Sequence, residues 1–441
     1  MKILVKNGKV INPADKFEQE ADLLIEDGII KKIGSKINDD DVEKVINAKG
    51  CLVMPGFIDL DTHLTDPGPE ENGTVISEMK AGARGGYTTI VAMPDTNPVI
   101  DNADAVKYVV NKAKSEECIN VLQAGALTKG SKGEELTDIK ALYEAGVPAL
   151  SDAGKTVNDT YVFFNGLKMA RDLNLPVFAH CEDAYLEHGG VINDDENAKR
   201  LDMPVYSNEV EDVVMARDLI LAYKSGARVH ISRCSTHGAV KMVGLAKKLG
   251  VNVTAEVTPH HFTLSSDDIK EFISVPENGI MIPHDNDADT NYKVKPPLRT
   301  LSDIETIKEG LKEDVIDVIA TDHTPHTFES KNTSMRYAPF GIVGLETAAA
   351  ITYTELVLNN VITPMQMAEK MSYNPAKILG IDKGDISEGK VADIVIFDIK
   401  EHYKIDKSTF VSMGKNTPFD GKEVIGKVKA TICGGNVVYE A

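Results

Sequence analysis

The sequence predicts an α/β protein: a (β/α)₈ barrel of the TIM type, with a small β-sandwich formed by the N- and C-terminal segments. Three observations predict this fold. The middle of the chain alternates short apolar runs with helical patterns, polar residues crowd the end of each run, and both ends of the chain read as strands. We expect the barrel over residues 55–380 and the sandwich over residues 1–54 and 381–441.

The two ends of the chain are β-rich. Residues 2–5, 21–25 and 29–33 have strand patterns, and Asn7-Gly8 and Asp27-Gly28 are hairpin signals between them. At the other end, residues 392–397 have a strand pattern, and a hairpin over 427–439 turns at Gly434-Gly435. Two β-rich ends around a different middle predict one sandwich built from both.

The middle of the chain contains eight apolar runs and six clear helical patterns. Parallel strands that alternate with helices close into a barrel, and such barrels carry their catalytic groups at the C-terminal ends of the strands. An acidic loop over 284–293 is expected to be solvated. The runs cover 57–60, 88–93, 120–126, 147–150, 176–179, 228–231, 251–257 and 315–320, and the helices 76–84, 103–114, 139–145, 161–173, 209–224 and 236–249.

Composition limits the possible partners and the compartment. The formal net charge of −20 argues against nucleic acid or an anionic membrane as a partner, because both repel an acidic protein. No apolar run is long enough for a transmembrane helix, and the N-terminus has a strand pattern instead of a signal peptide. The five cysteines are spread along the chain and odd in number, which predicts a reducing, cytoplasmic setting.

The ends of the predicted strands carry the candidate chemistry. Asp61 and His63 are two residues apart, so on a strand they point to the same face, and both are good ligands for divalent cations. The alternative is a polar strand end whose Asp caps the next turn. Asp322, after the eighth run, can ligate a metal or take a proton from a bound water, or else cap a helix. Histidines at several strand ends favour metal-assisted hydrolysis on one rim.

The motifs together resemble the bacterial dihydroorotases of the amidohydrolase superfamily, over nearly the whole chain. The resemblance implies a distorted barrel with a β-sandwich, a zinc site, and reversible closure of N-carbamoyl-aspartate to dihydroorotate. The residues that carry it are 55–59 (PGFID), 66–68 (DPG), 85–89 (GGYTT), 179–182 (AHCE), 255–261 (AEVTPHH), 296–299 (PPLR), 320–323 (ATDH), 340–347 (FGIVGLET), 374–377 (NPAK), 392–393 (AD) and 416–419 (NTPF).

The metal positions implied by the resemblance are only partly kept. His63, His180 and Asp322 match the family pattern, and Asp61 replaces a histidine with another possible ligand. Two ligand positions are lost, at Ala153 and Arg233, although a one-residue shift in the alignment would move the first to Asp152. Arginine stays protonated and has no free lone pair, so Arg233 is expected to repel a metal and to replace it electrically by pairing with Asp61 or Asp322.

The implied substrate positions also depart from the family. Thr65 stands where the family has an arginine that grips the substrate carboxylate, and Asp95 and Lys295 each replace an asparagine. His326 is retained. We therefore interpret Asp95, Lys295 and His326 as substrate-binding residues. Cys181 and Cys234 lie beside two ligand positions and are interpreted as buried small residues, with zinc ligation as the alternative.

This pattern leaves three possible functions, of which a full two-zinc dihydroorotase is the least favoured. The first is a hydrolase that holds at most one zinc ion through Asp61, His63 and Asp322 and acts on a cyclic amide, ureide or carbamoyl amino acid. The second is a catalytically silent homologue that serves as a structural partner, for example of an aspartate carbamoyltransferase. The resemblance also implies a homodimer.

Overall fold

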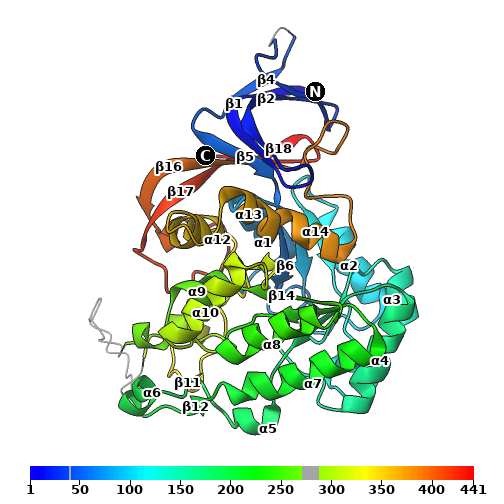
Figure 1. Cartoon of the computed structure of the whole chain (residues 1–441), viewed down its shortest axis with the longest axis vertical. Helices are drawn as coiled ribbons and strands as arrows, with labels where there is room; N and C mark the ends of the chain where they lie inside the picture. The colour runs from blue at the N-terminus through cyan, green and yellow to red at the C-terminus, as the bar shows by residue number, and fades with distance from the viewer. Residues whose placement is uncertain (39–40, 271–287) are drawn as a thin grey trace.

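The barrel and the sandwich are both present in the protein (Figure 1). The computed structural model describes residues 1–38, 41–270 and 288–441. Within them each of the eight predicted runs overlaps a barrel strand, with ends that differ by one or more residues. These strands are β6 (Phe57–Thr62), β7 (Tyr87–Ala92), β8 (Asn120–Gln123), β9 (Leu150–Ser151), β10 (Val177–His180), β13 (Val229–Ser232), β14 (Val253–Val257) and β15 (Val318–Ile319).

The barrel strands are parallel and form two sheets that backbone bridges join into a ring. One sheet has the order β6-β7-β8 and the other β15-β14-β13-β10-β9. A parallel bridge between Gly125 and Leu150 joins β8 to β9, and one between Thr62 and His323 joins β6 to the segment after β15. The predicted fold class is confirmed, and the ring places the end of β6 beside the end of β15.

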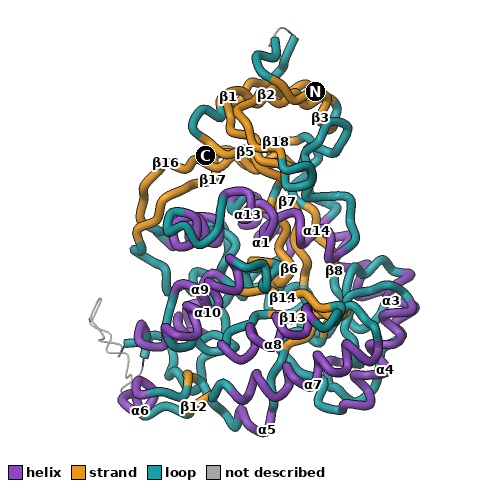
Figure 2. The backbone as a smooth tube through the Cα atoms, viewed as in Figure 1, coloured by secondary structure: helices purple, strands orange, loops and turns teal. Residues whose placement is uncertain are grey.

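Helices surround the barrel strands (Figures 1 and 2). Helix α1 shows why they form: Thr74 and Ser77 make a capping box, and Val75, Met79 and Ala83, four residues apart, are buried on one face. The six predicted helices are α1 (Val75–Arg84), α2 (Ala103–Ala113), α3 (Ile139–Glu144), α4 (Thr160–Asp172), α7 (Glu209–Ser225) and α8 (His237–Lys248).

Further helices and short strands lie in the connections. They include α5 (Ala184–Glu187), β11 (Ile192–Asn193), α6 (Glu196–Leu201), β12 (Val205–Tyr206), α9 (Pro259–Thr263), α10 (Leu301–Lys312), α11 (Phe328–Lys331), α12 (Ala348–Thr352), α13 (Pro364–Ala368) and α14 (Asn374–Leu379). Of the expected acidic loop, residues 284–287 lie outside the described residues, and Thr290–Tyr292 form a short 3₁₀ turn.

Both ends of the chain contribute to a single sheet, in the order β18-β17-β16-β5-β1-β2-β3 with β4 beside β1. The joint is the antiparallel pairing of β16 with β5, where Ile394 lies opposite Pro55. Its core combines residues from both ends, such as Ile3, Val53 and Ile432. The strands are β1 (Lys2–Asn12), β2 (Phe17–Glu26), β3 (Ile29–Gly34), β4 (Lys44–Asn47), β5 (Cys51–Pro55), β16 (Ile394–Lys404), β17 (Glu423–Cys433) and β18 (Asn436–Glu440).

One of the two predicted N-terminal turns is wrong. Strand β1 runs through Asn7-Gly8, and the chain turns at residues 13–16 instead. At Asn7 the φ angle is 61° and the register shifts between Val5 and Gly8, which is a β-bulge. A Cβ at Gly8 would lie 2.4 Å from Cγ2 of Val53, so the glycine permits close packing. The Asp27-Gly28 turn is confirmed.

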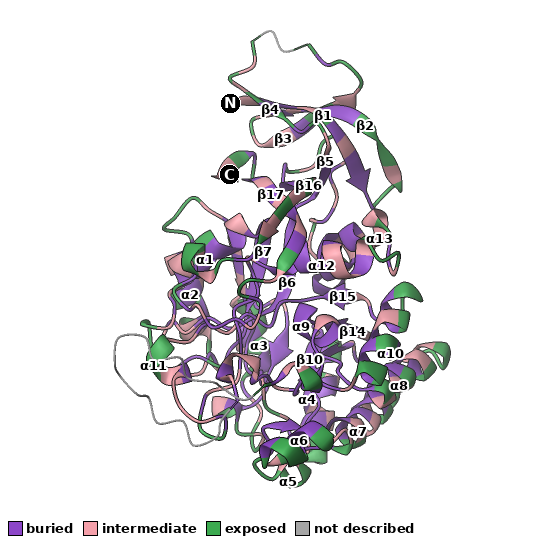
Figure 3. Ribbon diagram, turned by 90° about the vertical axis from the view of Figure 1, so that its left-hand side faces the viewer, coloured by how far each residue is buried: buried purple, intermediate pink, exposed green. Residues whose placement is uncertain are grey.

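Buried residues are concentrated in the barrel, with its covering helices, and in the sandwich. The barrel strands are mostly buried, and the exposed residues lie on the outer helices, the loops and the strands of the terminal sheet (Figure 3). Among the described residues, no helix is both long and apolar enough to cross a membrane. Several charged residues that follow the barrel strands are nevertheless buried, among them Asp61, Arg233 and Asp322, and they form the candidate site.

Candidate active site

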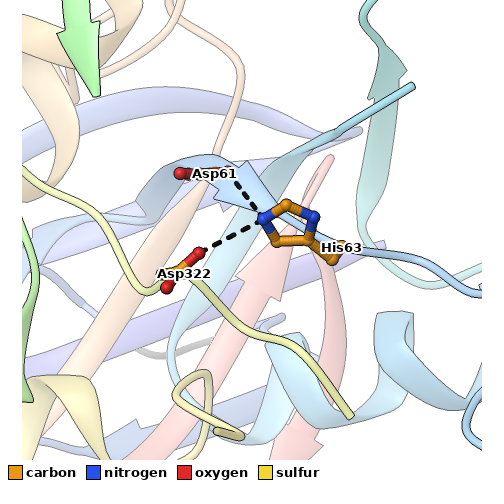
Figure 4. A group of neighbouring side chains, drawn as sticks. All are labelled: Asp61, His63 and Asp322. Atoms are coloured by element: carbon orange, nitrogen blue, oxygen red, sulfur yellow. Dashed lines mark hydrogen bonds and ion pairs between the residues drawn. The ribbon is translucent and has the colours of Figure 1, made fainter. Parts of the chain in front are cut away.

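Asp61, His63 and Asp322 form a buried cluster where β6 and the segment after β15 meet (Figure 4). His63 Nε2 lies 3.2 Å from Asp61 Oδ1 and 3.2 Å from Asp322 Oδ1. Each residue offers one ligand atom, and these atoms all lie within 4.8 Å of one another. The β6–His323 bridge accounts for this meeting, because it fixes the two strand ends side by side.

Arg233, directly after β13, sends its guanidinium into this cluster. Its Nη1 donates to Asp322 Oδ1 at 2.8 Å, its Nε lies 3.3 Å from Asp61 Oδ2, and its Nη2 lies 3.3 Å from Nδ1 of His180. The side chain is 5% exposed. Arg233 and Asp322 both have left-handed backbones, with φ of 58° and 52°, which residues other than glycine adopt when their surroundings hold them there. The predicted pairing of Arg233 with Asp61 and Asp322 is present.

The charges in the cluster stabilise one another. Burial raises the pKa of Asp61, but Arg233 and His63 outweigh burial, so this pKa lies below its usual range. Burial likewise lowers the pKa of Arg233, and Asp322 and Asp61 outweigh it and raise this pKa. Burial opposes the protonation of His63, yet its pKa is raised well above normal by Asp95, Asp322 and Asp61. The guanidinium is therefore a permanent cation, and a metal ion at His63 must displace a proton.

His180, at the end of β10, has both ring nitrogens engaged. Nδ1 accepts from Arg233, and Nε2 lies 3.2 Å from Oε2 of Glu182, so the tautomer that satisfies both contacts carries its proton on Nε2. Burial and the nearby Arg233 lower the pKa of His180, which keeps the ring neutral. This predicted ligand borders the cluster but presents no free lone pair to it.

The segment after β9 offers no carboxylate to the cluster. Asp152 accepts hydrogen bonds from the backbone N–H and the hydroxyl of Thr128. Ala153 is buried among barrel residues such as Leu60 and Phe178. The arrangement fits the assignment of the lost bridging position to Ala153, with Asp152 in a structural role.

The three predicted substrate residues have partners within the protein. Asp95 Oδ2 lies 2.7 Å from Nδ1 of His63, and Lys295 Nζ lies 2.9 Å from Oε1 of Glu182. His326 donates from Nε2 to the carbonyl of Phe340 at 2.8 Å and lines a cavity of about 530 Å³. The hydroxyl of Thr65 donates to the Gly73 carbonyl at 2.7 Å. Asp95 thus contacts the cluster through His63, whereas the contacts of Lys295 and His326 given above are with other residues.

Two buried groups near the cluster had no role in the sequence interpretation. His260 lies with Nε2 4.0 Å from Asp322 Oδ2, and that nitrogen has no hydrogen-bond partner among the described residues. Glu256 is buried against His230, 3.0 Å away, and burial together with Asp61 raises its pKa well above normal. Both residues belong to the 255–261 motif that carries the family resemblance, but the motif assigned neither of them a role.

The cysteines beside the site are buried and free. Cys181 Sγ lies 3.9 Å from Oδ2 of Asp218, and burial raises the pKa of both Cys181 and Cys234 well above normal. Neither joins the metal-ligand group found among the described residues. A buried thiol that resists ionisation is a poor metal ligand, which favours the interpretation of both as small core residues.

The cluster fits one divalent metal ion. Neither carboxylate oxygen of Asp61 has a hydrogen bond within the described part of the chain, although both are buried. Zinc binds aspartate and histidine at about 2.0–2.2 Å, so ligand atoms around it lie roughly 3.3–3.5 Å apart. The 3.2 Å separations at His63 are close to that value. Asp61, His63 and Asp322 are the residues that would hold the ion.

Comparison with known proteins gives consistent results along the whole chain. A family model described as "Dihydro-orotase-like" matches residues 50–239. The chain is 44% identical to a dihydroorotase of Clostridioides difficile (strain 630), with 100% of each chain covered. It is 42% identical to a dihydroorotase of Clostridium acetobutylicum, with 99% of each covered.

Solved structures show the same fold. A crystal structure titled D-hydantoinase has a TM-score of 0.84 at 27% identity, covering 100% of this chain and 95% of that one. The L-hydantoinase (dihydropyrimidinase) from Arthrobacter aurescens has a TM-score of 0.84 at 24% identity, covering 99% and 96%.

Proposed function

Because the chain belongs to the dihydroorotase family of the amidohydrolase superfamily, a family of hydrolases acting on cyclic amide C–N bonds, we propose that it opens or closes a cyclic amide or ureide with a single metal ion. The ion is held by Asp61, His63 and Asp322, and zinc suits this ligand set. The observation that carries the proposal is the buried Asp61 carboxylate, which faces His63 and Arg233 without a hydrogen bond.

The charge of the site supports one divalent ion and no second. Asp61, Asp95 and Asp322 contribute three negative charges and Arg233 one positive charge, which leaves a net charge of −2 when both histidines are neutral. One divalent cation balances that charge. A second would lie beside a buried guanidinium, where repulsion between like charges is strong. Arg233 thus takes the electrostatic place of a second ion.

The side chains have distinct proposed roles in hydrolysis. A bound zinc ion lowers the pKa of a water molecule and polarises a carbonyl group. Asp322 accepts the proton of the attacking water and returns it to the departing amide nitrogen. Arg233 keeps its charge and has N–H groups beyond those bound to Asp322 and His180, so it can donate to the oxygen that becomes negative as water adds to the carbonyl.

The substrate class is a cyclic amide, ureide or carbamoyl amino acid, but recognition of an acidic substituent differs from the family pattern. Thr65 carries no charge and its hydroxyl is bound to Gly73, so it cannot clamp a carboxylate. Asp95 adds a negative charge near the cluster. Lys295 and His326 are the remaining candidates, which favours substrates less acidic than dihydroorotate.

The experiment that tests this proposal measures metal content and turnover together. Purified protein is incubated with zinc, dialysed and analysed by inductively coupled plasma mass spectrometry, then assayed with dihydroorotate, N-carbamoyl-aspartate, hydantoin and dihydrouracil. We expect about one zinc per chain and turnover of at least one ring that Asp322→Asn abolishes. Zinc-loaded protein that turns over none of them contradicts the proposal.

A second function is favoured by one observation: the guanidinium satisfies Asp322 and His180 without any metal. A buried ion-pair network of this kind can keep the fold intact in a catalytically silent homologue. Such a protein would act as a structural partner, for example of an aspartate carbamoyltransferase. This second function would be supported if the protein binds no zinc and co-elutes with a purified aspartate carbamoyltransferase on size exclusion. It would be excluded if the protein is active and elutes as a homodimer without the carbamoyltransferase.

A further inference from the structure

Asp95 was predicted to bind substrate, but its carboxylate contacts His63, one of the proposed metal ligands. It follows β7 in the segment Met93-Pro94-Asp95, and its Oδ2 lies 2.7 Å from Nδ1 of His63. Backbone pairing holds the two segments in register, because Thr62 pairs with Ala92 and the N–H of Met93 donates to the carbonyl of Thr62 at 2.9 Å. The contact is therefore built into the neighbouring strand ends.

The chemistry of this contact fixes how His63 faces the cluster. An ionised carboxylate only accepts hydrogen bonds, so Nδ1 of His63 carries the proton in the pair. Once a metal ion displaces the second proton of His63, the neutral ring presents the lone pair of Nε2, the atom that lies 3.2 Å from Asp61 and from Asp322. Metal-binding histidines commonly donate their second N–H to a carboxylate, which fixes the tautomer and makes the ligating nitrogen more basic.

We propose that Asp95 is a positioning residue that orients His63 for the metal ion, and that it is not a substrate-binding residue. This inference rests on the one-metal function proposed above. Asp95 is the carboxylate that holds the ring from outside the cluster, with 36% of its side chain exposed. An asparagine at this position can donate a hydrogen bond to a substrate, whereas an aspartate can only accept one and would repel a carboxylate.

His180 provides an internal comparison. Glu182 holds its Nε2 at 3.2 Å, much as Asp95 holds Nδ1 of His63. The other nitrogen of His180, however, is taken by Arg233 at 3.3 Å. Each histidine has one ring nitrogen against a carboxylate, but only His63 has its second nitrogen directed at Asp61, whose carboxylate oxygens accept no hydrogen bond among the described residues. Of these two histidines, only His63, directly after β6, thus has a ring nitrogen placed to bind a metal ion.

The test measures zinc affinity by competition with a chromophoric chelator in the wild type, Asp95→Asn and Asp95→Ala. Loss of such a carboxylate typically weakens metal binding by about 10–100-fold, which we expect for Asp95→Ala. Asp95→Asn should fall in between, because its amide oxygen still accepts from Nδ1–H but carries no charge. Asp104→Asn is the matched control, since the Asp104 side chain is 95% exposed on α2 and should leave affinity unchanged.

A spectroscopic readout separates orientation from folding. With cobalt(II) in place of zinc, the visible d–d bands report the ligand geometry, and they should shift in Asp95→Ala while far-ultraviolet circular dichroism stays as in the wild type. A zinc affinity in Asp95→Ala within twofold of the wild type, or unchanged cobalt bands, overturns the role of Asp95 alone. A wild type that binds no zinc at all overturns the metal site itself and this role with it.

Discussion

The Nη1 atom of Arg233 lies 2.8 Å from Oδ1 of Asp322, inside the barrel and shielded from solvent. The same guanidinium reaches Asp61 and His180. A fixed organic cation therefore occupies the position between the ends of β6, β10 and β15, and this contact determines how many metal ions the site can hold. The following predictions test its consequences.

Removal of the guanidinium should destabilise the metal-free protein. In Arg233→Met, Asp61 and Asp322 stay buried without their counter-ion, and breaking one partner of a buried pair typically costs about 3–5 kcal/mol. Urea denaturation in the presence of a chelator measures this loss, and zinc should restore more stability to the variant than to the wild type. Lys44→Met, which breaks an exposed pair with Glu440, should cost well under about 1 kcal/mol. Equal stability of the two variants would argue against a structural guanidinium.

Restoring both lost ligands should restore the second metal. Arg233→His supplies an imidazole and Ala153→Asp a bridging carboxylate, so the double variant should bind about two zinc ions per chain by mass spectrometry. Dihydroorotate turnover should rise with the metal content. The single variants serve as controls and should stay near one ion. A double variant that still holds one ion contradicts the assignment of residues 153 and 233 to the lost positions.

Asp322 should be essential for turnover and dispensable for folding. Replacing a general acid–base residue typically lowers kcat by about 10²–10⁴-fold. Asp322→Asn keeps the shape of the side chain and can still accept from Arg233, whose charge is still balanced by Asp61, so the loss of stability should be smaller than in Arg233→Met. Steady-state kinetics on the best substrate of the panel measures the effect, with Asp104→Asn as the control for loss of one negative charge. Turnover within tenfold of the wild type would exclude a proton-transfer role.

Stability should rise with pH through the titration of Lys331. Its ammonium is buried, and burial together with the nearby Lys293 lowers its pKa to about 7 from an ordinary 10.5. The unfolded chain therefore binds more protons than the folded chain between pH 7 and 10.5, and stability increases with pH across that window. Between pH 7 and 9 the free energy of unfolding should rise by about 2 kcal/mol from this group.

Lys331→Met isolates that contribution. Urea denaturation at both pH values should show a smaller rise in the variant than in the wild type. Replacement of the exposed Lys140, 75% accessible on α3, should leave the pH dependence unchanged. An identical rise in the wild type and Lys331→Met would mean that the buried lysine keeps an ordinary pKa.

Most of the fold could be predicted from local patterns. Apolar runs and helical periodicity located the eight barrel strands and six helices, because each element buries one face or its whole length in the core. The Asn7-Gly8 turn was predicted wrongly because the same dipeptide that favours a hairpin also suits a bulge. The deciding fact was tertiary: Gly8 packs against Val53, which lies far along the chain.

The candidate site could be predicted only in part, for a similar reason. Strand-end positions brought Asp61, His63, Asp322 and Arg233 together, because the carboxyl ends of parallel strands share one rim. The direction of individual hydrogen bonds was beyond the sequence. The sequence did not indicate whether the Asp95 side chain would face a substrate or His63. It also did not indicate that Arg233 and Glu182 would engage both nitrogens of His180.

The number of metal ions bound beside Arg233 tests the central claim most directly. We predict that a crystal of zinc-incubated protein, with anomalous data collected at the zinc edge, will show one peak among Asp61, His63 and Asp322. The guanidinium should still lie within hydrogen-bonding distance of Asp322. Two peaks on this rim, with Arg233 turned away from Asp61 and Asp322, would contradict the account.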